Sequence, residues 1–212
     1  MKNNKILKLS DLLRKKMKKP AGQWQVWCKR PKTLAEKEMV IIGAILTQNT
    51  NWKNVNYALD NLKKADCLRL KSIFALGKEN MPRLAELIRP AGFFNSKSKY
   101  LFEISKFFVE HGGVSTVARG ELGTLREKLL SLRGVGPETA DSILLYALGK
   151  PIFVIDEYTR RICLKYGISE EKDYHTLQKL FMENLPKEFG LFQDFHAFIV
   201  LAGQNKKNTD VF

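Results

Sequence analysis

The stretch Leu132-Arg-Gly-Val-Gly-Pro-Glu-Thr-Ala-Asp141 places a glycine turn between two helix-like segments. A basic, leucine-rich segment ends near Leu132, and Pro137 stands where a new helix would begin, a position at which its missing N–H group costs little. Glycines allow a sharp turn and expose backbone amides, and the first turn of a helix attracts anions. The stretch therefore predicts a helical hairpin that could hold a phosphate group, although an ordinary turn between helices also fits.

Helical periodicity extends outward from this hairpin over almost the whole chain. Met39 to Leu46 is a continuous apolar run in a segment that begins near Leu34, and its helix-favouring flank indicates a buried helix. Further helices are expected at 53–65, 81–89, 97–110, 121–131, 138–148, 157–166, 174–184 and 191–202. Only Pro151 to Ile155 is strand-like, and it is too short to found a sheet. The expected fold class is all-α, with about ten short helices.

A single carboxylate, Asp156, follows the hairpin after a helix of about ten residues and an apolar connector. It stands at the start of another helical segment, where aspartate commonly caps the helix. Spacing alone favours this capping role. A cap also fixes a carboxylate in place, so a catalytic role is compatible with it.

The charge balance points to a polyanionic partner. The chain has 36 basic and 22 acidic residues and a formal net charge of +14. Nucleic acid is the first choice for such a partner. A lysine-rich proteome would also produce basic proteins without one, so the charge marks a surface rather than a site.

The N-terminal segment Met1 to Pro20 is basic but lacks the continuous apolar core of a signal peptide. One helical face of this segment gathers Ile6, Leu9, Leu13 and Met17. Such a helix could dock on the rest of the protein or lie on a membrane surface. No run approaches the roughly 20 apolar residues of a membrane span, and we expect a cytoplasmic protein.

The three cysteines, Cys28, Cys67 and Cys163, are odd in number and far apart. They provide neither a disulfide framework nor the clustered thiolates of a zinc or iron–sulfur site. We expect buried free thiols and neither a metal ion nor another cofactor.

These motifs resemble the helix-hairpin-helix/Gly-Pro-Asp superfamily of DNA glycosylases, in its endonuclease III branch. The family's hairpin, Leu-x-Gly-Val-Gly-x-x-Thr-Ala, is matched by Leu132, Gly134, Val135, Gly136, Thr139 and Ala140. Its catalytic segment is matched by Ile155, Asp156 and Arg161. Two upstream segments are also similar, namely Leu46–Thr50 and Ile88–Lys99. Together these motifs are highly specific, whereas any one of them alone is not.

The resemblance implies two α-helical domains that flank a DNA-binding cleft. Residues 34–148 would form a six-helix domain with the hairpin, and residues 1–33 and 149–212 would pair into a discontinuous domain. The hairpin residues Gly134, Val135, Gly136 and Thr139 would hold DNA phosphate, and Asp156 would be catalytic. Gln48 and Asn49 would lie in the loop that relatives push into the duplex where a nucleotide has been flipped out. Gln48 could equally be an ordinary polar loop residue or a helix cap.

Two departures from the family pattern narrow the expected reaction. Lyase-competent relatives carry a lysine two residues after the second hairpin glycine, and this chain has Glu138 there. A carboxylate cannot form a Schiff base with the opened sugar, because that step needs an amine. The last residues also lack the four cysteines with which many relatives bind a four-iron–four-sulfur cluster. Both departures look most like the 3-methyladenine DNA glycosylase III type.

The expected function is therefore a monofunctional DNA glycosylase that acts as a monomer on duplex DNA with a damaged base. An N-alkylated purine is cationic, and an aromatic pocket would bind it by stacking and cation–π attraction. The candidates for this pocket are Trp24, Trp27, Trp52 and Tyr158, with Glu138 adding electrostatic attraction. Each aromatic residue could instead be packing, and Glu138 could simply favour the start of its helix. A bifunctional glycosylase/lyase for oxidised bases and a non-catalytic DNA-binding module remain as alternatives.

Overall fold

The computed structural model describes residues 4–17, 19–20 and 22–204, and the regular structure in this part of the chain is entirely helical. The all-α prediction is confirmed, and Pro151 to Ile155 has no regular structure. The chain divides into two compact units. The central unit comprises Pro31–Leu148, and the chain-end unit combines the residues up to Arg30 with those from Gly149 onward.

The central unit contains eight α-helical segments, one 3-10 helix and one π-helix, where six helices were expected. They are α3 (Leu34–Leu46), α4 (Trp52–Lys64), α5 (Leu70–Glu79), α6 (Met81–Leu87), the 3-10 helix η1 (Arg89–Ala91), α7 (Phe94–Glu110), α8 (Val114–Val117), α9 (Leu122–Leu130), α10 (Pro137–Ser142) and the π-helix η2 (Ile143–Ala147). Several of these segments are only one or two turns long, and α10 continues directly into η2.

Helix α3 forms the core of the central unit. Thr33 and Glu36 make a reciprocal capping box at its N-terminus. Every residue from Val40 to Leu46 is buried, and the helix contacts α7 and η2. A helix that is apolar on all sides belongs in the interior, and the expected buried helix is confirmed.

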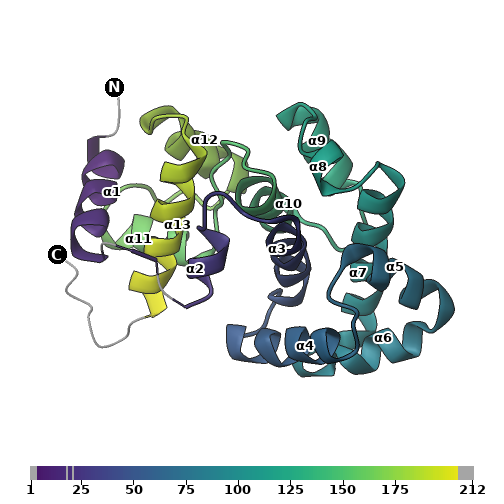
Figure 1. Ribbon diagram of the computed structural model, residues 1–212. Coiled ribbons are helices and arrows are strands. Elements are labelled where there is room, and N and C mark those ends of the chain that lie inside the picture. The colour runs from purple at the N-terminus through teal and green to yellow at the C-terminus, as the bar shows by residue number, and fades with distance from the viewer. Residues whose placement is uncertain (1–3, 18, 21, 205–212) are drawn as a thin grey trace. The chain divides into compact units, whose positions relative to one another are not determined.

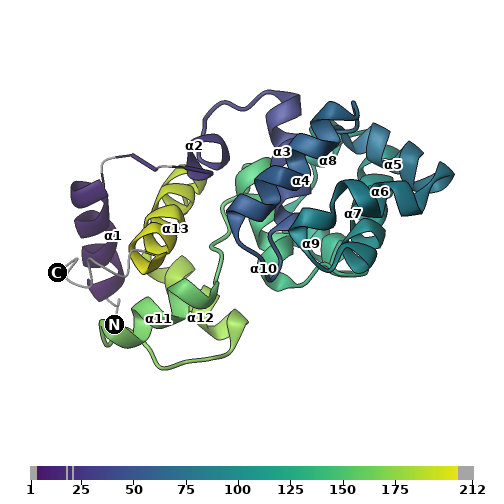
Figure 2. The same cartoon turned by 90° about the horizontal axis from the view of Figure 1, so that it is seen from below.

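Helix α5 is absent from the sequence-based expectation, and tertiary contacts explain why. The preceding Arg69 makes no capping hydrogen bond, and Gly77 within the helix resembles a break. In the structure, a Cβ atom at Gly77 would lie 2.6 Å from Cδ2 of Phe102, so glycine allows α7 to pack closely. Arg69 forms an ion pair with Glu38 of α3. Helices α5, α6 and α7 consequently lie side by side (Figure 2).

The chain-end unit combines helices from both ends of the sequence. They are α1 (Asn4–Met17), α2 (Trp24–Trp27), α11 (Glu157–Lys165), α12 (Tyr174–Asn184) and α13 (Phe189–Gln204). Helix α13 contacts both α1 and α11 (Figure 1).

The N-terminal helix docks within the chain-end unit through its apolar face. Ile6, Leu9 and Leu13 are buried, and α1 contacts α12 and α13. The Lys5 ammonium group also donates a hydrogen bond to the Gly167 carbonyl oxygen at 2.7 Å. Of the two alternatives for this helix, docking on the protein is the one observed. None of the described helices combines the length and the apolarity needed to cross a membrane.

Candidate functional site

The hairpin between α9 and α10 is a tight turn in which a glycine occupies the N-cap of the second helix. Gly134 has a φ of +82°, and the Val135 amide donates to the Leu132 carbonyl oxygen at 3.1 Å. Gly136 is extended at the N-cap, and Pro137 is the first residue of α10, as the sequence predicts. Gly136 has no side chain and therefore makes no side-chain capping hydrogen bond at this end of α10.

Gly134 is required by both its conformation and its neighbour. A Cβ atom at this position would lie 2.2 Å from Cγ of Tyr100. We expect Gly134→Ala to lower the free energy of unfolding by about 2–3 kcal/mol, because a positive φ and an overpacked contact each cost free energy. Denaturant unfolding measures this loss. Gly136→Ala is the matched control, since its φ is −88° and a Cβ atom there meets nothing within 4 Å. Equal stability of the two variants would contradict the prediction.

A buried ion pair clamps the two helices of the hairpin together. Arg126 of α9 donates through Nε to Oδ1 of Asp141 at 2.7 Å and through Nη2 to Oδ2 at 3.1 Å. The Asp141 side chain is fully buried in α10, and the Arg126 side chain is mostly buried. A bidentate pair of this kind fixes the relative placement of α9 and α10.

Gln48 is tied to the hairpin by its side chain. Its Nε2 donates to the Gly134 carbonyl oxygen at 2.8 Å and to Oγ1 of Thr139 at 3.0 Å. The following residue, Asn49, is exposed and left-handed, with a φ of +50°. Gln48 therefore holds the loop after α3 against the hairpin, and Asn49 forms the exposed tip of that loop.

All the expected DNA-binding residues of the central unit line one pocket of about 730 Å³. Those residues are Gln48, Asn49, Gly134, Val135, Gly136 and Thr139, together with Glu138. Phe93 and Lys97 line the same pocket and are not among the residues that the sequence motifs predict. The signal for both is the Gly92–Lys97 segment, whose family similarity assigns no role to either residue.

Phe93 is an unusual residue at the edge of this pocket. Its side chain is 70% exposed, the largest exposure among the large hydrophobic residues described. Its φ of +46° is uncommon for an aromatic residue and turns the chain into α7. Strained, exposed aromatic residues are typical of binding sites rather than of packing.

Lys97 is buried beneath the pocket and makes hydrogen bonds to the C-terminal ends of two helices. Its ammonium group donates to the carbonyl oxygens of Leu46 at 2.8 Å and Ala91 at 2.7 Å. Leu46 ends α3 and Ala91 ends η1, so Lys97 satisfies carbonyl groups that these helices leave without an internal partner. Burial lowers the pKa of Lys97 to about 8.

This pKa predicts a pH dependence of stability. From about pH 8 to the ordinary value of 10.5, the unfolded chain binds more protons at Lys97 than the folded chain. The contribution of Lys97 to the free energy of unfolding should therefore rise with pH across this window. The test compares urea unfolding of the parent and Lys97→Met, with Lys99→Met as the control for loss of one positive charge. A parent-minus-Lys97→Met difference that is the same at pH 8 and pH 10 would refute the prediction.

In the chain-end unit, Asp156 is the N-cap of α11. Its Oδ1 accepts from the Thr159 amide at 2.7 Å and from the Thr159 hydroxyl at 2.8 Å. Its Oδ2 lies 3.5 Å from Nε2 of His196. Burial by itself raises the pKa of this carboxyl, but the His196 charge beside it and the hydrogen bonds from Thr159 outweigh burial and lower it. Asp156 therefore caps α11 from a buried position, and its surroundings favour the carboxylate form.

The aromatic candidates lie in different surroundings. Trp24 and Trp27 are buried against each other at 5.5 Å between ring centroids. The Tyr158 ring packs on Gly203 of α13, where a Cβ atom would lie 2.4 Å from it. Trp52 begins α4 in the central unit and is half-buried. Packing accounts for the observed positions of Trp24, Trp27 and Tyr158.

The remaining predicted residues are placed simply. Glu138 is exposed in the first turn of α10, where an acidic residue favours the helix dipole. Cys28 and Cys163 are buried as expected, whereas Cys67 is only half-buried. Burial raises the pKa of the Cys163 thiol to about 12. Within the described residues, no group of three or more His, Cys, Asp or Glu side chains could hold a metal ion.

Comparison with known proteins identifies relatives of this chain. The model of the HhH-GPD superfamily base excision DNA repair proteins matches residues 42–187. A Methanocaldococcus jannaschii protein, named as a DNA repair glycosylase, is 47% identical over 165 residues, which are 76% of this chain and 74% of that protein. Endonuclease III of Haemophilus influenzae is 28% identical over 165 residues, or 78% of this chain and 72% of the relative.

Solved structures show the same fold. Helicobacter pylori 3-methyladenine DNA glycosylase, bound to 1,N6-ethenoadenine, has a TM-score of 0.77 and 31% identity, with 97% of this chain and 98% of that chain covered. A non-covalent endonuclease III–DNA complex has a TM-score of 0.72 at 19% identity, with 95% and 86% covered.

Proposed function

The chain belongs to the HhH-GPD superfamily and is a DNA glycosylase of base excision repair, and we propose that it hydrolytically removes N-alkylated purines from duplex DNA. The product would be an abasic site, without strand cleavage by the enzyme. The observation that carries the hydrolytic mechanism is Glu138 at the position where lyase-competent relatives carry a lysine. Lys97 does carry an amine and lines this pocket, but its ammonium group is buried and donates to two carbonyl oxygens.

Asp156 would carry the chemical step. As the damaged base departs, the sugar gains oxocarbenium character, as in glycoside hydrolysis generally. A carboxylate stabilises that positive charge and orients or deprotonates the attacking water. The lowered pKa of Asp156 supports this role, because only the ionised form can do either task at neutral pH.

The hairpin pocket would hold the DNA. The amides at the start of α10 would bind a phosphate group, which fixes the protein on the duplex without reading a base. The exposed Phe93 and Asn49 beside the hairpin would contact bases where the duplex opens. Aromatic side chains that stack on or enter between bases stabilise such distorted DNA.

The proposed lesion rests on its chemistry and on one relative. An N-alkylated purine is already cationic and leaves without strong acid assistance, so an aspartate can suffice. The Helicobacter pylori glycosylase, 31% identical, acts on 3-methyladenine by its name. Trp52 and Glu138 are the first candidates for contacts with the flipped base. Trp24, Trp27 and Tyr158 would have to leave their observed packing to make such contacts.

A panel of duplexes tests the proposal. The duplexes carry 3-methyladenine, 7-methylguanine, uracil, thymine glycol or 8-oxoguanine, and single-turnover base release is measured on each. We expect release of the methylated purines, strand breaks only after alkali and no covalent adduct with borohydride. Glu138→Lys, which restores an amine, should form such an adduct. A trapped adduct with the parent protein would indicate the bifunctional alternative, and no base release from any lesion would indicate the non-catalytic one.

A further inference from the structure

The two oxygens of the Asp156 carboxylate have different partners. Oδ1 receives both hydrogen bonds from Thr159, which belongs to the same helix. Oδ2 faces Nε2 of His196 at 3.5 Å, from helix α13. The local partner and the distant partner together define the plane of the carboxylate.

His196 is enclosed by aromatic rings that fix its orientation. Its side chain is 5% exposed. The Trp24 ring meets it edge to face at 5.6 Å and 82°, and the Phe153 ring does so at 6.2 Å and 86°. These contacts come from α2 and from the connector that leads to Asp156. A ring held on two sides in this way has little freedom to turn its Nε2 atom away from Oδ2.

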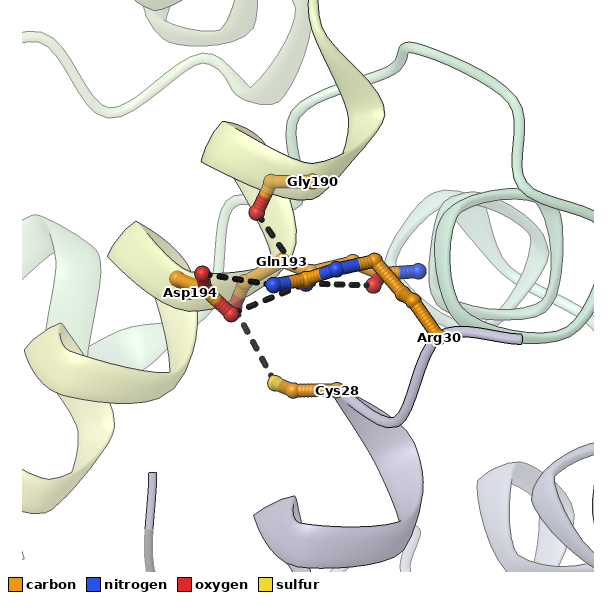
Figure 3. A network of polar contacts seen from close by, with 5 residues as sticks. All are labelled: Cys28, Arg30, Gly190, Gln193 and Asp194. Atoms are coloured by element: carbon orange, nitrogen blue, oxygen red, sulfur yellow. Dashed lines mark hydrogen bonds and ion pairs between the residues drawn. The ribbon is translucent and has the colours of Figure 1, made fainter. Parts of the chain in front are cut away.

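A polar network fastens the segment after α2 to α13 beside His196 (Figure 3). Arg30 donates to both carboxylate oxygens of Asp194, at 2.9 and 2.8 Å, and to Oε1 of Gln193 at 3.0 Å. The Cys28 thiol donates to the Gln193 carbonyl oxygen at 3.5 Å. Since α2 carries Trp24, this network also holds Trp24 against the His196 ring.

We propose that His196 is a positioning residue for base excision: from its enclosed place on α13 it orients Oδ2 of the Asp156 carboxylate. This inference rests on the proposed catalytic role of Asp156. His196 would act through that carboxylate rather than on the DNA.

The ion pairs that charged side chains of α11 and α13 form do not involve Asp156, apart from its contact with His196. On α11, Glu157 and Arg161 pair with each other in solvent at 2.8 Å. On α13, Asp194 pairs with Arg30. Helix α2 carries no charged residue, and α12 contributes the Tyr174 hydroxyl, which lies 3.5 Å from the Ile155 amide. The charge that lowers the pKa of Asp156 is that of His196.

The functional test is the pH profile of single-turnover base release from a methylated-purine duplex. We expect His196→Phe to slow release at neutral pH at least about tenfold, because displacing a reacting group by an ångström costs on the order of a hundredfold. The acidic limb of the profile should also move to higher pH. His196→Gln, which keeps a donor, should recover part of the rate. His175→Phe, which replaces an exposed histidine of the same unit, is the matched control. A uniform loss without a shifted limb, or no rescue by glutamine, would overturn the inference.

An NMR titration separates failure of this inference from failure of the proposed function. The Asp156 carboxyl signal of the parent protein and of His196→Phe is followed against pH. We expect a higher Asp156 pKa in the variant, because His196 helps to lower the pKa of this carboxyl in the parent. Identical titrations in the two proteins would refute the coupling even if the parent excises bases. Absence of base release would refute the proposed function while leaving the coupling measurable.

Discussion

Replacing Asp156 with asparagine is expected to slow base release by about a thousandfold while leaving the fold intact, because only the charge is removed. Asparagine caps helices as well as aspartate does, so its side-chain oxygen can still accept from Thr159. The variant therefore separates the capping role from the catalytic role. Single-turnover kinetics measure the rate of base release, which reports the catalytic role. Denaturant unfolding measures the free energy of unfolding, which reports the capping role.

Asp173 provides a matched control for this substitution. It caps α12 in the same unit and accepts from the Thr176 amide at 2.8 Å, three residues along the chain, as Asp156 does from Thr159. Asp173→Asn should release bases at the parental rate. Parental rates in both variants would leave Asp156 as a cap only, and a loss of folding in Asp156→Asn alone would point to a structural role of the charge.

Arg126→Met is expected to lower the free energy of unfolding by about 3–5 kcal/mol, because it removes the guanidinium from a fully buried carboxylate. The side chain of Asp141 is 0% exposed, so water cannot replace the lost partner. Thermal or urea unfolding measures the loss. The double variant Arg126→Met/Asp141→Leu should recover much of it, because an apolar pair can take the place of a buried ion pair.

An exposed ion pair of the central unit supplies the control. Arg83 and Glu86 are 49% and 64% exposed. Arg83→Met should change the free energy of unfolding by no more than about 0.5 kcal/mol, because exposed pairs contribute little. Comparable losses of the free energy of unfolding in Arg126→Met and Arg83→Met would show that burial does not make the hairpin ion pair more important for stability.

The parts of this fold that the sequence predicts depend on neighbours within a helical turn or two. The apolar run of α3 follows a Thr33 cap. The glycines and Pro137 specify the hairpin, and Asp156 caps a helix three residues before Thr159. Each signal is local, because helix starts, turns and buried faces are set by residues close in sequence.

The contacts that the sequence does not predict act over long separations. Gln48 contacts Thr139 across 91 positions, and Arg126 meets Asp141 across 15. His196 looks like any residue on the apolar face of α13 until its distance to Asp156 is known. Lys97 resembles a surface lysine, although its amine is buried between two helix ends. Such pairs depend on packing between helices, which periodicity does not specify.

The order in which the chain is synthesised has a bearing on how the chain-end unit can form. Lys5 and Gly167 are 162 residues apart, and Arg30 and Asp194 are 164 apart. The central unit is complete once Leu148 has left the ribosome, whereas α1 emerges before that unit and its partners α12 and α13 emerge after it. Until then the apolar side chains of α1 have no native partner and are exposed to chaperones and to aggregation. A chain truncated before α13 should therefore expose the apolar face of α1 and aggregate, rather than form a smaller active enzyme.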